Sequence, residues 1–119
     1  MSLPSFPELT HAIGQKLAPF RKSQAKTMQG FSAMALSAMA DGALSEKHKE
    51  FIALAIGITQ GCHGCIGYHV KALVRLGATK AELEEALGVA VYMGGGPALM
   101  HTADALAAWE QFQPASVTA

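Results

Sequence analysis

Apolar residues recur at helical spacing along nearly the whole chain, and no segment of useful length alternates between apolar and polar residues as a strand does. The clearest stretch begins at Ser45. Within it, Phe51, Leu54 and Ile58 fall on one face of a helix. Ser45 suits the N-cap, because its hydroxyl can accept a hydrogen bond from a backbone N–H that has no partner in the first turn. The pattern predicts an all-α fold.

Glycines, prolines and capping residues divide this pattern into about six helices. We expect them to cover residues 8–18, 23–40, 45–60, 62–76, 79–93 and 98–109. Pro19 is expected to end the first helix, and Thr79 with Glu82 forms a capping box. The Gly-Gly-Gly-Pro run at 94–97 follows no strand and precedes no Lys-Ser or Lys-Thr pair. It therefore indicates a sharp helix–helix turn with close backbone packing rather than a phosphate-binding loop.

The length of the chain, 119 residues, is typical of one domain, so we expect residues 1–119 to form a single compact unit. Half of the residues are hydrophobic, which is enough to build a core and favours self-association. The last residues, 113–119, are expected to be loose.

Charge and hydropathy argue against two kinds of partner. Nine basic and nine acidic residues balance to zero formal charge, with no basic stripe to neutralise phosphates, so we expect no nucleic acid. No uninterrupted apolar segment approaches the ~20 residues needed to span a membrane. The N-terminus lacks the charged start and apolar run of a signal peptide. We therefore expect a soluble, cytoplasmic protein.

Cys62 and Cys65 are the only two cysteines, and they lie three positions apart. A secreted disulfide scaffold would carry more cysteines at wider spacings, so a close pair in a reducing compartment indicates catalysis or metal binding. The pair follows Gly61 at the predicted start of a helix. Unpaired N–H groups and the helix dipole favour the reactive thiolate there. We interpret the pair as a redox-active dithiol.

His69 and Glu50 are the residues best placed to move protons at this dithiol. His69 lies four residues after Cys65 and therefore on the same helix face, one turn further on. Glu50 lies on the preceding helix, and two antiparallel helices joined near Gly61 could bring it against that face. A carboxylate beside a histidine would complete a relay of base, imidazole and thiol.

These residues also have simpler interpretations. A single glutamate on a helix is usually solvated, a single histidine on an apolar face is usually a core residue, and cysteines in an Ala-rich helix can be small hydrophobic residues. Zinc is the main competitor, because four donors are present in Cys62, Cys65, His69 and Glu50. Structural zinc sites usually draw two ligand pairs from separate segments, whereas three of these donors share one helix face. We therefore favour the redox dithiol over a zinc site and expect no metal.

The remaining aromatic and histidine side chains near the pair carry weaker signals. His63 lies inside the pair, where it either raises the local positive charge or faces solvent. His48 and His101 are isolated in the sequence and are interpreted as surface or core histidines. Tyr68 either stacks over the site or only packs.

The spacing of Glu50, Cys62-x-x-Cys65 and His69 resembles the core motif of the alkylhydroperoxidase D-like proteins, which belong to the carboxymuconolactone decarboxylase superfamily. The resemblance assigns roles to these residues. Cys65 would attack a peroxide and become a sulfenic acid, which Cys62 would resolve to a disulfide. His69 and Glu50 would relay protons. The decarboxylase branch lacks the cysteine pair, which argues against ring-lactone decarboxylation.

The likeness extends over residues 44–109, including the turn at 77–79 and the run at 94–100. It implies an all-helical domain in which this segment is the core and the helices at 8–40 precede it in the sequence. Small members of the family assemble as trimers or hexamers, which agrees with the self-association expected from composition.

The implied activity is that of a thiol-dependent peroxidase with an antioxidant role. It would need no metal and no organic cofactor, and it would reduce hydroperoxides with electrons from an external dithiol, such as a lipoyl domain or a thioredoxin-like protein. Two alternatives remain. One is a thiol–disulfide oxidoreductase or redox sensor acting on a protein disulfide, and the other is a non-catalytic zinc-binding or assembly module.

Overall fold

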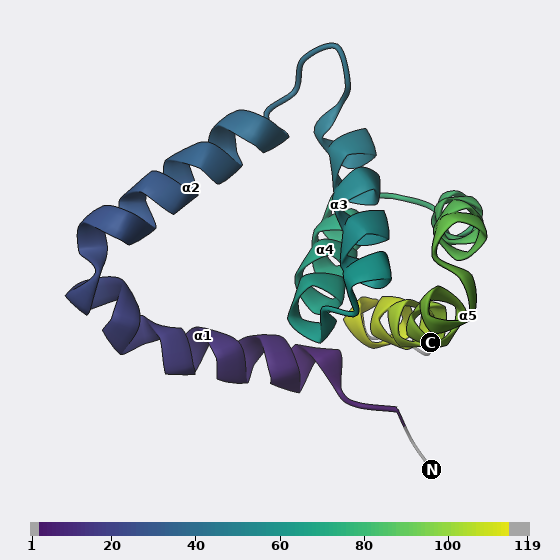
Figure 1. Ribbon diagram of the computed structural model, residues 1–119, viewed down its shortest axis with the longest axis horizontal. Helices are drawn as coiled ribbons and strands as arrows, with labels where there is room; N and C mark the ends of the chain where they lie inside the picture. Colours follow the sequence, from purple (N-terminus) through teal and green to yellow (C-terminus); the bar gives the residue numbers. More distant parts are fainter. Residues whose placement is uncertain (1–2, 115–119) are drawn as a thin grey trace, which may run out of the picture.

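This computed structural model describes residues 3–114 of the chain, which contain five α-helices (Figure 1). In chain order they are α1 (Phe6–Ser23), α2 (Ala25–Met39), α3 (Glu46–Gln60), α4 (His63–Arg75) and α5 (Lys80–Phe112). These residues contain no strand, so the all-α prediction is confirmed. The predicted loose end falls largely on residues 115–119, which lie outside the described residues. Within 3–114, no helix combines the length and apolar character needed to cross a membrane.

Helix α5 unites the last two predicted helices, which is why five helices are present rather than about six. The predicted turn appears as a kink, because the backbone leaves the helical conformation at Gly95, with φ 71° and ψ −153°. Residues with a side chain rarely adopt this conformation, so the kink needs glycine. Gly94 is tightly packed: a Cβ there would lie 2.6 Å from Ala98 Cβ and 3.0 Å from Thr59 Cγ2. The predicted close packing is thus present at Gly94, whereas a Cβ on Gly95 or Gly96 would meet nothing within 4 Å.

The prediction that Pro19 ends the first helix is wrong, because α1 continues through it to Ser23. Proline cannot donate to the carbonyl four residues earlier. Pro19 is exposed, however, so water can satisfy that carbonyl. The helix also begins earlier than expected, at Phe6. Its N-cap is Ser5, whose hydroxyl accepts a hydrogen bond from the Glu8 N–H at 3.3 Å.

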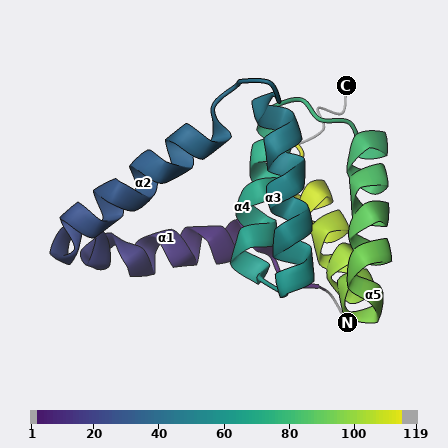
Figure 2. The same ribbon diagram turned by 45° about the horizontal axis from the view of Figure 1, so that its top comes forward.

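The hydrophobic core lies among α3, α4 and α5, with the N-terminal end of α1 packed against it. Its largest fully buried side chains are Phe6, Leu54, Ile58, Ile66, Leu73, Leu83 and Val70. Figures 1 and 2 show α3 and α4 side by side, with the two arms of α5 packed along one side of them. Two of these core side chains, Leu54 and Ile58, belong to the apolar stripe predicted for α3.

Helix α2 leans away from this core and has no buried residue. Figures 1 and 2 show that α2 and the far end of α1 form an open V beside α3. Three large apolar side chains of α2 are exposed: Phe31 by 59%, Met34 by 60% and Leu36 by 76%. The apolar face of α2 is therefore uncovered in a single chain.

The capping box predicted at the start of α5 is present. Thr79 Oγ1 accepts a hydrogen bond from the Glu82 N–H at 3.1 Å, and the Glu82 carboxylate accepts one from the Thr79 N–H at 2.9 Å. Lys47 Nζ donates to the same carboxylate at 2.8 Å, which ties α5 to α3. The Lys47 hydrogen bond, followed by that from the Thr79 N–H, lowers the pKa of Glu82 to about 2.

Candidate active site

The two cysteines lie at the N-terminus of α4, as the sequence predicts. Cys62 is the N-cap residue and Cys65 lies in the first turn. A disulfide joins them, with their Cα atoms 5.2 Å apart. The Cys62 sulfur accepts a hydrogen bond from the Cys65 backbone N–H at 3.1 Å. Both residues are half-buried, so the pair stands at a helix start within reach of solvent.

Helices α3 and α4 form an antiparallel hairpin around Gly61 (Figure 1). Gly61 closes α3 in the left-handed conformation, with φ 67°, and its N–H donates to the carbonyls of Gly57 and Ile58. The helices pack closely next to the disulfide, because a Cβ on Gly57 would lie 3.1 Å from Cys65 Cβ. This hairpin determines which α3 residues face the dithiol end of α4.

Glu50 and His69 meet across the hairpin. Glu50 Oε2 lies 2.7 Å from His69 Nδ1, a contact that the sequence permits but cannot establish. Glu50 is 7% exposed, whereas the His69 side chain is 30% exposed. A carboxylate can only accept a hydrogen bond, so Nδ1 carries the proton and Nε2 is left for another partner. An oriented imidazole therefore stands one turn beyond Cys65.

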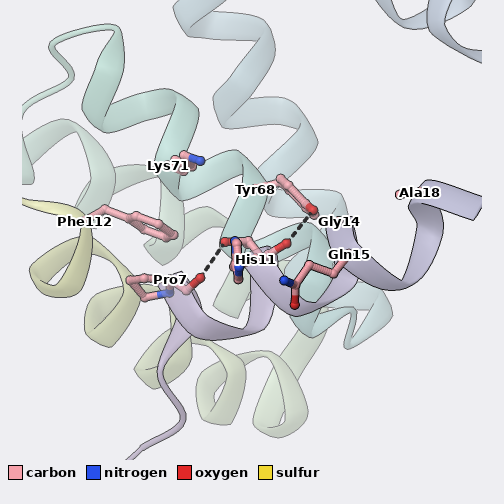
Figure 3. Close-up of a pocket in the computed structure, with 9 residues that line it drawn as sticks. Pro7, His11, Gly14, Gln15, Ala18, Tyr68, Lys71 and Phe112 are labelled. Atoms are coloured by element: carbon pink, nitrogen blue, oxygen red, sulfur yellow. Dashed lines mark hydrogen bonds between the residues drawn. The ribbon is translucent and has the colours of Figure 1, made fainter.

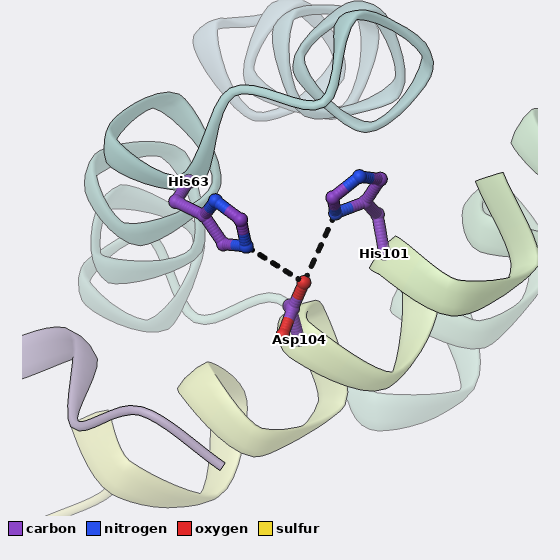
Figure 4. A group of neighbouring side chains, drawn as sticks. All are labelled: His63, His101 and Asp104. Carbon is purple, nitrogen blue, oxygen red and sulfur yellow. Dashed lines mark hydrogen bonds and ion pairs between the residues drawn. The ribbon is translucent and has the colours of Figure 1, made fainter. Parts of the chain in front are cut away.

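His63, His101 and Asp104 form a second polar cluster that the sequence analysis missed (Figure 4). Asp104 Oδ2 lies 3.3 Å from His63 Nε2 and 3.0 Å from His101 Nδ1. His101, which is isolated in the sequence and is interpreted there as a surface or core histidine, is instead part of this cluster. Helix α5 bends at Gly95, and its second half carries His101 and Asp104 to the start of α4. The one available signal was the spacing of His101 and Asp104, one helical turn apart.

Tyr68 packs against α1 rather than stacking over the dithiol. Its hydroxyl donates to the Thr10 carbonyl at 2.9 Å (Figure 3). Tyr68 lines a groove of about 770 Å³, together with Lys71, Phe112 and side chains of α1. None of the lining residues belongs to the dithiol or to the Glu50–His69 pair. The groove is therefore separate from the candidate active site.

The four candidate zinc donors at the dithiol are paired with one another in this structure. The sulfurs of Cys62 and Cys65 are bonded to each other, and His69 is hydrogen-bonded to Glu50. Sulfur binds zinc as a thiolate, so the disulfide form cannot offer these two ligands. Within residues 3–114, the one group of three or more side chains close enough for a metal ion is the second cluster.

Comparison with protein families matches residues 25–108, more than half of the chain, to the carboxymuconolactone decarboxylase family. The chain belongs to this family. Its structure is similar to that of a family protein from Legionella pneumophila, with 52% identity and a TM-score of 0.88 over 90% of this chain and 96% of that one. A family protein from Thermotoga maritima, described with a possible part in an antioxidative response, is 27% identical with a TM-score of 0.72 over 91% and 89% of the two chains. An uncharacterised protein from the cox locus of Paracoccus denitrificans is 34% identical over 93% of this chain and 96% of its own length.

Membership confirms the resemblance drawn from the cysteine motif, together with the all-helical fold that it implied. The carboxymuconolactone decarboxylase family includes decarboxylases and peroxidase-like enzymes, so membership alone does not select an activity. Which of these activities the chain has therefore depends on the side chains at its site.

Proposed function

We propose that the protein is a thiol-dependent peroxidase, which reduces hydroperoxides by cycling Cys62 and Cys65 between dithiol and disulfide. The observation that carries the proposal is the Glu50–His69 hydrogen bond, held on the same helix pair as the disulfide. A dithiol alone suits several redox functions, whereas peroxide cleavage also needs a proton donor for the leaving alkoxide. The possible antioxidative response of the Thermotoga maritima relative supports the same role.

The proposed cycle begins with the reduced pair. The Cys65 thiolate attacks the terminal peroxide oxygen, the O–O bond breaks, and the alkoxide takes a proton from the His69 imidazolium and leaves as an alcohol. The Cys62 thiolate then attacks the sulfenic acid on Cys65, forming the disulfide and releasing hydroxide, which is protonated to water. The sulfur pair loses two electrons and the peroxide gains them. Glu50 holds the imidazole in position throughout.

An external dithiol must return the two electrons. We propose a lipoyl domain or a thioredoxin-like protein, because thiol–disulfide exchange transfers both electrons without a further cofactor. The half-buried Cys62–Cys65 disulfide at the end of a helix is accessible to such a partner.

Single-cysteine variants test the assignment. With a panel of hydroperoxides and a lipoyl-type or thioredoxin-type reductant, Cys65→Ser is expected to abolish peroxide consumption. Cys62→Ser should leave a sulfenic acid on Cys65 that dimedone can trap. His48→Gln is the control. His48 is hydrogen-bonded to Ser45 at the start of α3 and has no part in the proposed relay, so this variant should keep the wild-type activity. Full activity in Cys65→Ser, or no trapped sulfenic acid in Cys62→Ser, would contradict the assignment.

The hydrogen bond to Cys62 favours a second candidate, a thiol–disulfide oxidoreductase or redox sensor that acts on a protein disulfide. A backbone N–H donor at a helix N-terminus stabilises negative charge on sulfur, so Cys62 is suited to be the attacking or leaving thiolate in disulfide exchange. Turnover of a protein disulfide, such as that of insulin, is to be compared with turnover of hydroperoxides. Faster turnover of the disulfide would favour this candidate over the peroxidase.

We also propose that the working unit is a homo-oligomer, a trimer or a hexamer. The support is the uncovered apolar face of α2, which contains Phe31, Met34 and Leu36. Exposed apolar patches of this kind mark protein–protein contacts, and a second copy of the chain would remove them from water.

A further inference from the structure

We propose that His63, His101 and Asp104 bind one divalent transition-metal ion of the zinc class. The donors are two imidazole nitrogens and one carboxylate oxygen, and the three ligand atoms all lie within 4.8 Å of one another. They come from the start of α4 and from the second half of α5 (Figure 4). The site uses neither the Glu50–His69 pair nor the sulfurs, so it does not depend on the proposed peroxidase activity.

The distances in the cluster are close to those of a metal-bound site. Zinc binds imidazole nitrogen and carboxylate oxygen at about 2.0–2.2 Å, which places two donors at a tetrahedral angle about 3.4 Å apart. Asp104 Oδ2 already lies 3.3 Å from His63 Nε2 and 3.0 Å from His101 Nδ1. The two imidazole nitrogens lie within 4.8 Å of each other, and an ion would draw His63, whose side chain is 51% exposed, toward the shorter spacing.

The exposure of the ligands increases across the site. The side chain of Asp104 is 11% exposed, that of His101 25% and that of His63 51%. The carboxylate therefore lies at the base of the site and His63 at its solvent side, where an ion can enter. Three protein ligands leave a fourth position for water or an exogenous ligand, the pattern of reactive rather than structural zinc sites.

Neighbouring groups orient both imidazole rings before any ion binds, and they hold His101 more closely than His63. His101 packs over the loop that precedes the dithiol, since a Cβ on Gly61 would lie 3.2 Å from His101 Nε2. The His63 ring stacks on Phe6 with centroids 6.5 Å apart, and it meets the His101 ring edge-on at 5.2 Å. Ligands that are already ordered lose less conformational entropy on binding, which favours the ion.

The same side chains have a simpler role available. Asp104 can accept one hydrogen bond from each imidazole, which connects α5 to α4 without any ion. A cluster with only this role would show no specific affinity for a metal ion. Metal binding that depends on the histidines therefore distinguishes the two roles.

The test uses the untagged, full-length protein with the Cys62–Cys65 disulfide intact, so that no thiolate can bind the ion. After chelator treatment, calorimetric titration with Zn²⁺ and absorption spectra with Co²⁺ should each show one ion per chain. His63→Gln should weaken binding by at least about tenfold, and His101→Gln should do the same. His48→Gln removes a histidine outside the cluster and should bind like the wild type.

Thermal unfolding supplies a second readout. Zn²⁺ should raise the unfolding midpoint of the wild type and of His48→Gln, because an ion that binds the folded state stabilises it, but not that of His63→Gln. Circular dichroism of the metal-free variants establishes that each is folded, and His101→Gln serves if His63→Gln is not. A wild type without stoichiometric binding, or a folded cluster variant with wild-type affinity, would overturn the proposal.

Discussion

Replacing Glu50 by glutamine, Glu50→Gln, keeps the shape of the buried side chain and removes its charge. Glu50 is 7% exposed, and its carboxylate lies 2.7 Å from His69 Nδ1. A glutamine amide can donate as well as accept, so it no longer selects the imidazole with its proton on Nδ1. Proton delivery by His69 should become slower, and the reaction of the reduced dithiol with peroxide should slow with it.

The size of the effect follows from the hydrogen bond that is lost. A hydrogen bond to a charged group contributes about 1.5–3 kcal/mol. Because about 1.4 kcal/mol corresponds to a factor of ten in rate, the variant should react roughly 10- to 150-fold more slowly with a hydroperoxide.

The assay is peroxide consumption by pre-reduced protein in a single turnover, which removes any dependence on the external reductant. Glu46→Gln is the matched control. Glu46 lies one turn earlier on α3, its side chain is 34% exposed, and it pairs with the exposed Arg75 at 3.1 Å. Exposed pairs contribute little, so this control should keep its rate within about twofold of the wild type. A folded Glu50→Gln protein within the same margin, or an equal loss in both variants, would refute the reasoning.

Three further predictions concern stability and assembly. Gly94→Ala should destabilise the fold by about 1–3 kcal/mol in urea unfolding, because its Cβ would overlap neighbouring atoms. Gly88→Ala on the same helix adds a Cβ that meets nothing within 4 Å, so it should stabilise the fold by about 0.5–1 kcal/mol. A change of the same sign in the free energy of unfolding of both variants would contradict the close packing at Gly94. The folded pKa of Glu82, about 2, lies below its ordinary 4.5, so the stabilisation from Lys47 is present above about pH 4.5 and is lost as the pH falls toward 2. Glu82→Gln should therefore lower the unfolding midpoint more at pH 6 than at pH 2, and an equal effect at both would contradict this linkage. Leu36→Glu places a charge on the uncovered face of α2 and should reduce the sedimentation coefficient toward that of a single chain, whereas an unchanged coefficient would exclude this face from the proposed assembly.

Most helix boundaries could be predicted because their signals are local. Ser45 caps α3 and Thr79 caps α5, each through a hydrogen bond to a backbone group three residues away. The kink at Gly95 is also encoded locally, by a backbone conformation that favours glycine. The effect of Pro19 could not be predicted in the same way. Its cost to helix stability depends on whether water reaches the carbonyl four residues earlier, and exposure is a property of the folded molecule.

The sequence by itself determined that this chain is all-helical and carries a dithiol at a helix start, because cysteine spacing and capping are read within one helical turn. The tertiary structure decided which groups surround that dithiol. Glu50 touches His69 because the hairpin at Gly61 packs α3 on α4 at one particular angle and register. His63 and His101 are 38 positions apart and meet because α5 bends at Gly95. Helix orientation results from the packing of the whole core, and no local pattern of residues encodes it.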